Sequence, residues 1–330
     1  MRRVVIVNRN AGRLVDEGPL LDALRRRRSE VTVCETASVA ELGAAITGLY
    51  DFATPELIAF AGGDGTYMAG LSALEREREL RGLPSLPRVA LLPGGTVCTV
   101  ARSFGFAHGG VASLGAARRV QYIDDLLDAI ACGADATTTT PTLRVKWSDV
   151  DGRRHERLAF IFGAGLVSRF FDMYYEGGGP AGLRRAALIV TRVFAGAPVR
   201  APTARRILTP VACTLEIDGA DSGLTRASLV VASVLDDLGL GMRLTYRARE
   251  RGDRFHAVAS ALGPETLAPQ LPLVLMGEPL LGQGVDALAS RMRLRFDAPG
   301  SWVLDGDVLQ SREVEVALGP TLDVATLRRG

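Results

Sequence analysis

Short strand-like runs alternate with segments of helical periodicity along the first 135 residues. The strand-like runs are Val4–Val7, Val31–Cys34, Leu57–Ala61 and Arg88–Leu92. Apolar residues at helical spacing follow through Leu20, Leu21 and Leu24, from Val39 to Leu49, from Thr66 through Met68, Leu71 and Leu74, from Val97 to Phe104, and from Ile123 to Ala131. This alternation predicts an α/β fold with a doubly wound parallel sheet, in which ligands bind outside the carboxyl ends of the strands.

The pattern changes after residue 135 into many short strands separated by Gly, Pro or Asp. These strand-like runs are Thr142–Trp147, Arg157–Phe162, Ala212–Ile217, Ser228–Ser233, Met242–Tyr246, Phe255–Ala259, Met292–Phe296 and Trp302–Leu304. Many short strands with regular turn signals predict an antiparallel, β-sandwich-like domain. We place the boundary at the Thr-rich stretch Ala136–Pro141, which gives domains of residues 1–135 and 136–317. A return of the tail 318–330 to the first domain stays open.

Three of the predicted strands end in polar or glycine-rich turns, at Asn8–Gly12, Gly62–Gly65 and Pro93–Thr96. Glycines let the main chain approach a ligand closely, and the first N–H groups of a helix have no partner within it. Such turns suit a phosphate, and Asp64 adds a carboxylate for a divalent metal or for a hydrogen bond to a nucleotide. The alternative is that the glycines only make tight βα turns. Because the three turns converge at one edge of the sheet, phosphate binding is the favoured interpretation.

One helical segment interrupts the second domain, from Ala181 to Ala195. Its apolar residues Leu183, Ala186, Ala187, Val190 and Phe194 are expected on one side, with Arg185 and Arg192 opposite. Two interpretations stay open. The helix either packs on its own domain or is a basic amphipathic surface helix that meets anionic lipid.

Composition narrows the class of protein. At 330 residues the chain has room for roughly two domains of about 150 residues. The 39 Lys and Arg residues nearly balance the 37 Asp and Glu residues, and this net charge of +2 argues against a binder of long nucleic acids. The four cysteines form no CxxC pair, so we expect reduced thiols and no zinc site. Neither a signal-peptide core nor an apolar run of about 18 residues is found, so we expect a cytoplasmic protein that is able to touch a membrane surface.

The order of the motifs resembles the diacylglycerol-kinase catalytic family, which includes bacterial lipid kinases and sphingosine kinases. The resemblance rests on Asn8–Gly12, on Gly62–Thr66, on Leu92–Thr96 with Ala101-Arg102 after it, and on Asp305-Gly306-Asp307 near the C-terminus. A GGDGT turn followed one βα unit later by a PxGT turn is much more specific than either alone. The resemblance implies a nucleotide-binding α/β domain, a β-rich domain for the lipid substrate, ATP and Mg²⁺ as cofactors, and a lipid acceptor presented at a membrane surface.

The same resemblance implies roles for individual residues. Asp307 stands where the family has a glutamate that takes the proton from the substrate hydroxyl, and Asp305 matches a metal-linked aspartate. Asp64 and Asp305 are the candidate metal ligands, and Asp64 is counted with Asp305 and Asp307 among the catalytic residues. The implied nucleotide-binding residues are Asn8, Asn10, Gly12, Gly62, Gly63, Asp64, Gly65, Thr66, Gly94, Gly95 and Thr96.

The chain departs from the family pattern at several positions. Cys98 replaces an asparagine, Asp307 replaces the glutamate, and Thr137–Thr140 occupies the place of an expected aspartate after Gly133. Arg9 and Ala11 replace a proline and a serine in the first motif, and Arg251-Gly252-Asp253 replaces a metal loop, so we expect no metal there. Two alternatives to a lipid kinase therefore stay open. One is a kinase-like lipid- or nucleotide-binding protein with impaired catalysis, and the other is an NAD kinase, which shares the GGDGT turn.

Overall fold

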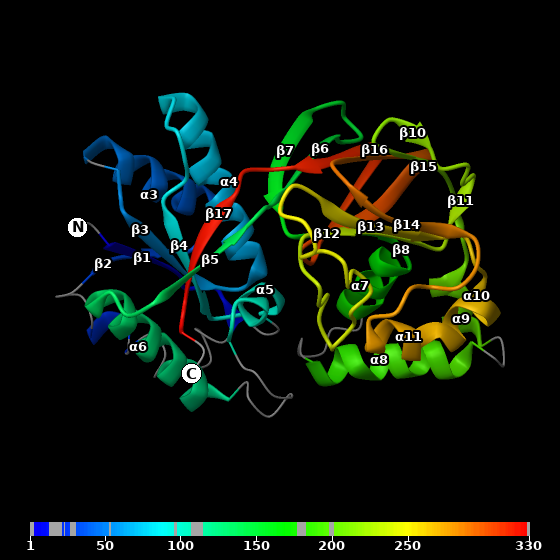
Figure 1. Cartoon of the computed structure of the whole chain (residues 1–330), viewed down its shortest axis with the longest axis horizontal. Helices are drawn as coiled ribbons and strands as arrows, with labels where there is room; N and C mark the ends of the chain where they lie inside the picture. Colours follow the sequence, from blue (N-terminus) through cyan, green and yellow to red (C-terminus); the bar gives the residue numbers. More distant parts are fainter. Residues whose placement is uncertain are drawn as a thin grey trace. The chain divides into compact units, whose positions relative to one another are not determined.

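The computed structural model describes residues 3–12, 22, 24–26, 31–52, 54–95, 98–106, 115–176, 183–197 and 201–328. The chain divides into two compact units, residues 1–140 together with 320–330, and residues 141–319 (Figure 1). The division falls after Thr140 and not after residue 135, and the C-terminal residues join the first unit. Each unit is described by itself.

The first unit is built on a mainly parallel sheet. Its strands are β1 (Arg3–Asn8), β2 (Thr32–Thr36), β3 (Leu57–Gly62), β4 (Arg88–Pro93), β5 (Ala136–Thr140) and β17 (Leu322–Thr326). Within the described residues these six strands lie in the order β2-β1-β3-β4-β17-β5, and only β5 runs antiparallel to its neighbour. The predicted parallel α/β sheet is confirmed.

Helices cover both faces of this sheet (Figure 1). They are α3 (Val39–Phe52), α4 (Asp64–Arg81), α5 (Thr99–Ser103) and α6 (Ala116–Cys132). On one face, Ile123, Leu126 and Ile130 of α6 pack on alternate residues of the strands, such as Val5 and Ala59. The opposite face meets α3 and α4. Burial on both faces explains why these strands read as continuous apolar runs. Of the predicted helix through Leu20, Leu21 and Leu24, only residues 22 and 24–26 are described; they are helical, and Leu24 is buried.

The Thr-rich stretch is a strand of the first sheet. The interpretation of Ala136–Pro141 as a domain boundary placed residues 136–140 in the wrong unit, because they form β5 and pair with β17 along its full length. Thr139 Oγ1 also donates a hydrogen bond to Asp323 Oδ1 at 2.7 Å. Threonine is β-branched and suits an edge strand with one exposed face. The partner strand lies far along the chain, so no local pattern marks this pairing.

The second unit is built on an antiparallel sheet. Among the described residues it has eleven strands in one hydrogen-bonded network. They are β6 (Leu143–Ser148), β7 (Arg154–Ala159), β8 (Ile161–Gly165), β9 (Val211–Ile217), β10 (Ala220–Asp221), β11 (Arg226–Ala227), β12 (Leu229–Ser233), β13 (Phe255–Ser260), β14 (Gly284–Ala289), β15 (Arg291–Leu304) and β16 (Asp307–Leu318). The predicted antiparallel β domain is confirmed.

Four of the predicted strands in this unit differ from the structure. Met242–Tyr246 is a turn region, and the runs at Met292–Phe296 and Trp302–Leu304 are two parts of the single long strand β15. The run Arg157–Phe162 is divided between β7 and β8 at Phe160. Period-2 alternation shows which residues are buried, but it does not show where a strand turns a corner.

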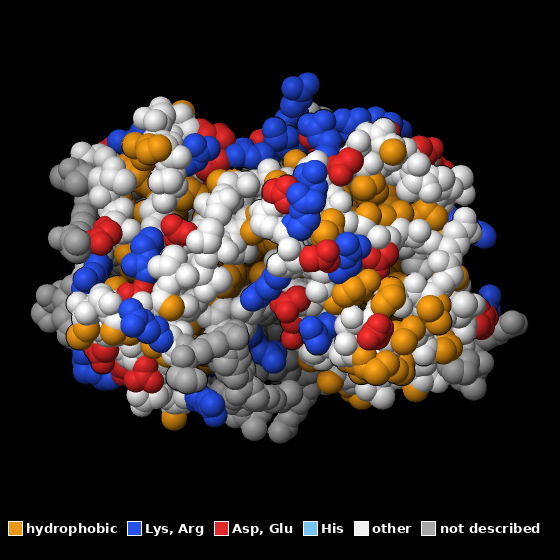
Figure 2. Space-filling view, viewed as in Figure 1, with side chains coloured by type: hydrophobic (Ala, Val, Ile, Leu, Met, Phe, Trp, Pro, Cys, Tyr) orange, Lys and Arg blue, Asp and Glu red, His pale blue; other side chains and the backbone are white. Residues whose placement is uncertain are grey.

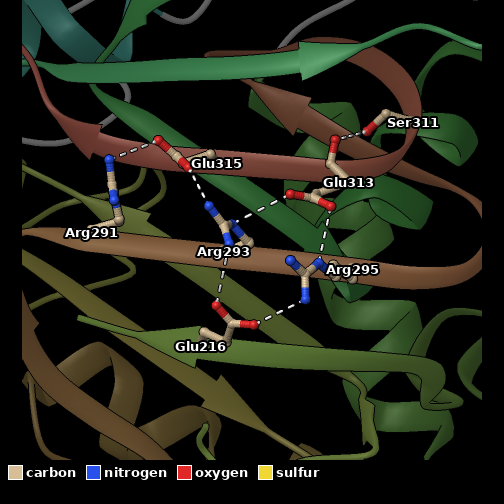
Figure 3. Close-up of polar contacts among 7 residues, drawn as sticks. All are labelled: Glu216, Arg291, Arg293, Arg295, Ser311, Glu313 and Glu315. Atoms are coloured by element: carbon tan, nitrogen blue, oxygen red, sulfur yellow. Dashed lines mark hydrogen bonds and ion pairs between the residues drawn. The ribbon is translucent and has the colours of Figure 1, made fainter. Parts of the chain in front are cut away.

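A ladder of alternating charges fixes the register of β9, β15 and β16 (Figure 3). Arg293 lies directly opposite Glu216 on one side and Glu315 on the other, and it makes ion pairs with both. Arg295 lies opposite Glu313 and Thr214, and it makes ion pairs with Glu313 and, diagonally, with Glu216. Each such cross-strand pair contributes about 0.2–1 kcal/mol, and a shift of one residue would move every charge to the buried face.

The helices of the second unit pack against its sheet across a shared core. They are α7 (Leu166–Glu176), α8 (Leu183–Gly196), α9 (Pro202–Leu208), α10 (Pro264–Leu267), the 3₁₀-helix η3 (Ala268–Gln270) and α11 (Leu271–Met276). The buried side of α8 consists of Ala186, Ile189 and Val193. The predicted face was therefore wrong at Ala187, which is exposed. The prediction for Leu183 concerns a side chain that is not described.

No helix in the described part of the chain is long and apolar enough to cross a membrane.

His256 on β13 is a buried imidazole that the fold keeps neutral. The backbone N–H of Arg247 donates to His256 Nδ1 at 3.3 Å, so Nε2 carries the proton and donates to Asp286 Oδ1 at 3.0 Å. Tyr246 and Glu250 also face this group. Burial lowers the pKa of His256 more than Asp286 raises it.

We expect the second unit to lose stability as the pH falls. The pKa of His256 in the folded chain is below its unfolded value of about 6.5, so acid favours the unfolded state as the pH drops through that value. Trp147 and Trp302, the chain's two tryptophans, both lie in this unit, so tryptophan fluorescence reports its thermal unfolding. Between pH 7.5 and 5 the melting temperature of His256→Gln should fall less than that of the natural chain. Equal slopes in the two proteins contradict the prediction.

Candidate functional site

The first two predicted turns meet at the point where the strand order of the first sheet reverses. The chain passes from β1 outward to β2 and then returns to β3 on the other side of β1. Across this switch point the side-chain amide of Asn8 donates to Thr66 Oγ1 at 2.8 Å. Open α/β sheets bind ligands at this place, beyond the carboxyl ends of the strands. The structure thus brings Asn8 and Thr66 together, as expected of one site.

The second and third turns touch through their backbones. Gly94 N–H donates to Gly62 O at 2.7 Å, and a Cβ on Gly95 would lie 2.5 Å from Gly63 Cα. The buried Tyr67 hydroxyl is 2.9 Å from Gly62 O and 2.8 Å from Leu92 O, and so joins the ends of β3 and β4. The glycines are needed here because two main chains lie where a side chain would stand.

Helix α4 begins at these turns. Its N-cap residue is Gly63, which has no side chain to accept hydrogen bonds from the first N–H groups, and its first residue is Asp64. An N-terminus of this kind has unpaired N–H donors and the positive end of the helix dipole. Gly65 is exposed, and Gly63 and Asp64 are half-buried. This is the geometry that binds a phosphate at a helix N-terminus.

Asp64 also holds the next helix. Its Oδ2 accepts a hydrogen bond from Thr99 N at 2.9 Å and its Oδ1 accepts one from Val100 N at 3.1 Å, so it caps α5. Burial raises the pKa of Asp64 to about 6, against the lowering effect of these two N–H groups. The carboxylate has lone pairs beyond those two bonds, and it fixes the start of α5 relative to α4.

The buried Arg119 of α6 is a site residue that the sequence analysis missed. Its Nη1 donates to Gly95 O at 2.8 Å and to Pro93 O at 3.3 Å, and it lies 3.5 Å from Cys98 Sγ. Its guanidinium also lies over the Phe106 ring, 5.6 Å from the centroid. The signal was present, because Arg119 precedes Ile123, Leu126 and Ile130 at the spacing of the buried face of α6.

Cys98 belongs to the same turn. It has a left-handed backbone with φ of 51°, its thiol donates to Gly95 O at 3.1 Å, and it is buried. Burial is the main reason that the pKa of Cys98 is raised to about 11. The thiol therefore stays protonated and stabilises the turn from within.

The first turn lies closer to the surface. Asn10 takes no part in the contact between the glycine turns. Its side-chain amide donates to Ala37 O at 2.6 Å, and its backbone N–H donates to Asn8 Oδ1 at 2.9 Å. Gly12 is exposed. Thr96 falls outside the described residues.

Asp305 and Gly306 form the tight turn between β15 and β16 in the second unit. Both have positive φ, 47° and 103°, and Leu304 pairs with Asp307 across the turn. Asp305 Oδ2 accepts from Phe160 N at 3.0 Å, and Oδ1 accepts from Ile161 N at 2.9 Å. The Asp-Gly pair is thus a hairpin turn of the kind its sequence favours, tied to the corner between β7 and β8.

Asp307 is exposed at the first position of β16. Its carboxylate lies 3.2 Å from Arg157 Nη1, in an ion pair between two exposed side chains. Beside it, the Tyr175 hydroxyl donates to Gly306 O at 3.1 Å, and Phe171 lies 3.8 Å from where a Cβ of Gly306 would be. The aromatic side chains of α7 therefore line the hairpin that carries Asp307.

The candidate metal ligands do not form a cage. In the ranges that the structure describes, no group of three or more His, Cys, Asp or Glu side chains lies together as a metal site. Asp64 lies in the first unit and Asp305 in the second, and each accepts two backbone N–H groups.

The family resemblance is confirmed by comparison with known proteins. Residues 2–124 match the family model described as the diacylglycerol kinase catalytic domain. This match spans β1 to β4 and both glycine turns, and it indicates a kinase. A comparison with curated proteins finds no match.

Three solved structures share the fold over nearly the whole chain. A proposed diacylglycerol kinase from Bacillus anthracis str. Sterne is 14% identical with a TM-score of 0.62, over 97% of this chain and 95% of that one. A diacylglycerol kinase from the same organism is 13% identical with a TM-score of 0.55, over 97% and 96%. Yeast NADH kinase complexed with NADH is 10% identical with a TM-score of 0.51, over 100% and 84%. At these identities the likeness shows the fold, and it leaves a lipid or an NAD-type acceptor open.

Replacing Gly95 with alanine should separate the two glycine turns. The new Cβ would lie 2.5 Å from Gly63 Cα, so one backbone must shift, at a cost of about 1–3 kcal/mol. Faster amide hydrogen exchange in residues 57–74 and 88–95 would show the change. Gly48→Ala is the matched control, because nothing lies within 4 Å of its added Cβ. Its exchange should be unchanged, and unchanged exchange in Gly95→Ala as well would contradict the steric argument.

Replacing Arg119 with methionine should loosen the third turn. The change removes the guanidinium donor from Pro93 O and leaves Gly95 O with only the Cys98 thiol as donor, and an unsatisfied buried group costs about 1–3 kcal/mol. We expect a lower free energy of unfolding by calorimetry and faster exchange in residues 92–106. Arg118→Met removes the exposed neighbour on the same helix and should have little effect. Equal losses in both variants would show that Arg119 does not hold the turn.

Proposed function

We propose that the chain is an ATP- and Mg²⁺-dependent lipid kinase that transfers the γ-phosphate of ATP to a lipid hydroxyl. The observation that carries this proposal is the backbone contact between the glycine turns after β3 and β4, beside the N-terminus of α4. The match of residues 2–124 to the diacylglycerol kinase catalytic domain supports the same class of reaction.

ATP fits the first unit through its phosphates. The N-terminus of α4 supplies N–H donors and a positive dipole, and Gly63 and Gly65 place no side chain over them. Arg119 and Cys98 donate hydrogen bonds to the carbonyl oxygen of Gly95 from within the protein. The negative end of this carbonyl dipole therefore points away from a bound anion. Phosphoryl transfer depends mainly on such positioning and charge neutralisation.

Magnesium fits Asp64 as a single carboxylate ligand. Magnesium in nucleotide sites takes one or two carboxylates together with phosphate oxygens and waters, and it does not need an all-protein cage. When bound, it would neutralise charge on the transferred phosphate. Asp64 would hold it, because the two N–H groups of α5 orient this carboxylate next to the first turn of α4.

Asp307 is the proposed general base toward the lipid hydroxyl. It is an exposed carboxylate at the end of a rigid hairpin, with Arg157 to orient it. Phe171 and Tyr175 of α7 lie beside this hairpin and offer an apolar surface for an acyl chain, and Tyr175 is 56% exposed. Base and apolar surface thus lie together within the second unit.

The alternative of a catalytically impaired binder has one observation in its favour. The thiol of Cys98, at the position of the family's asparagine, is buried and donates to its own turn, so it offers no hydrogen bond to a nucleotide. The alternative of an NAD kinase is favoured only by the shared fold of yeast NADH kinase. Both are outcomes of the same assay.

The test is transfer of label from γ-labelled ATP, with Mg²⁺, to acceptors in mixed micelles. The panel contains diacylglycerol, monoacylglycerol, a sphingoid base, phosphatidylglycerol, a total lipid extract and, separately, NAD. A labelled lipid is the expected product. Asp64→Asn and Asp307→Asn should each lower kcat by about 10²-fold or more, while Asp307→Glu should retain activity because it keeps a carboxylate.

Asp151→Asn, at an exposed carboxylate in the turn between β6 and β7, is the matched control and should keep the natural rate. Labelled NAD would replace the proposal with an NAD kinase. Binding of ATP without any labelled acceptor would leave a nucleotide-binding protein that lacks the proposed activity.

A further inference from the structure

An apolar surface lies outside the proposed catalytic residues, on the helical side of the second unit. Its members are Leu188 of α8, Leu275 and Met276 of α11, and Leu281 just after α11, and we refer to it as the α8–α11 surface. Their exposed fractions are 50%, 46%, 59% and 65%, in that order. Helix α11 consists only of apolar residues, yet none of them is buried. Figure 2 shows hydrophobic side chains gathered over this part of the unit.

The helices that carry this surface pack on the core of the second unit. The inner side of α8 packs into the same core cluster as Leu267 and Ala268, where α10 leads into η3. Helix α8 contacts η3, and η3 continues directly into α11. The exposed residues of α8 and α11 are therefore the outer sides of packed helices, and within the described second unit nothing covers them.

The charges on the helices around this surface are mainly positive. The segments α8, α9, η3 and α11 contain arginines at positions 185, 192, 205 and 206 and no aspartate or glutamate among their described side chains, whereas α10 carries the exposed Glu265. Arg185 and Arg206 make contacts within the unit, with Tyr174 and Glu176, whereas Arg192 is exposed on α8. Arg243 lies beside Gly277 at the end of α11. Glu278 is an acidic residue at the margin.

We propose that the α8–α11 surface docks on a membrane that contains anionic lipid. Exposed leucine and methionine side chains gain free energy by entering the boundary between headgroups and acyl chains, and neighbouring arginines attract anionic headgroups. A protein partner of matching chemistry would need acidic residues around an apolar patch, but an anionic bilayer supplies both features everywhere on its surface. The inference rests on the proposed lipid kinase function, because it names the surface by which the chain reaches its acceptor.

The first experiment measures co-sedimentation of the full chain with vesicles. One set of vesicles is phosphatidylcholine alone, and the other contains phosphatidylglycerol in addition. The double variant Leu275→Glu with Met276→Glu should lower the partition coefficient for the anionic vesicles by about tenfold or more. Val150→Glu is the matched control, because Val150 is 68% exposed in the same unit but lies in the turn between β6 and β7. It should bind as the natural chain does.

The second arm tests the charge. Arg192→Gln should weaken binding to the anionic vesicles and leave the weaker binding to pure phosphatidylcholine unchanged, and added salt should have the same effect. Equal binding of the double variant and the natural chain would overturn the proposal. So would a loss of self-association in the double variant, measured by light scattering, with no change in vesicle binding, because the surface would then join copies of the chain.

A third readout separates this proposal from the kinase proposal. The double variant should phosphorylate a short-chain lipid dissolved as monomers at the natural rate and lose activity only on acceptor lipid in vesicles. If no acceptor is phosphorylated by any protein, the kinase proposal fails while vesicle binding still decides the docking surface. If activity on monomers and vesicles falls equally, the surface serves the fold or the active site, and docking is rejected.

Discussion

The contact between Gly63 and Gly95 is the constraint on which the candidate site depends. Two neighbouring parallel strands end at the same edge of the sheet, and their turns lie so close that a Cβ on Gly95 would be 2.5 Å from the other main chain. Everything around the contact serves to keep it. Tyr67 joins the ends of β3 and β4, and Asp64 caps α5, the helix that follows the turn after β4. Arg119 donates hydrogen bonds to carbonyl oxygens of that turn. A helix N-terminus is thereby fixed in position before any ligand arrives, and preorganised donors of this kind cost no reorganisation when charge develops.

Much of the first unit could be predicted from the sequence because its signals are local. Strands buried on both faces read as continuous apolar runs, and the glycine turns follow them directly. The hydrogen-bond partners of Arg119 and the pairing of β5 with β17 could not be predicted with the same rules. A charged residue at a core position gives no indication of which backbone it will meet, and the threonines of β5 pair with a strand near the other end of the chain. Long-range partners decide both cases.

In the second unit the sequence predicted the type of strand correctly, but not where each strand begins and ends. Its strands were recognised as short and antiparallel, but Met242–Tyr246 is a turn and β15 was divided in two, because alternation does not distinguish a bend from an end. The motif Asp305-Gly306-Asp307 is a hairpin turn in the structure, and its match to the family signature stays a prediction, because the family model matches residues 2–124. The structure shows why these need not exclude each other. The positive φ of Asp305 and Gly306 makes the turn, and the turn sets the exposed Asp307 on its edge.

The departures from the family pattern differ in their physical consequences. Cys98 lies in the glycine contact itself, yet its thiol and Arg119 both engage Gly95 O, so the turn keeps its shape without an amide side chain. The threonines of β5 pair with β17 at the edge of the sheet, so their role there is structural. Asp307 is different, because the proposed base must reach a substrate proton, and aspartate is one methylene shorter than glutamate. Its carboxylate lies 3.2 Å from Arg157 Nη1, in an ion pair between two exposed side chains. Of the departures from the family pattern, Asp307 therefore bears most directly on the proposed phosphoryl transfer.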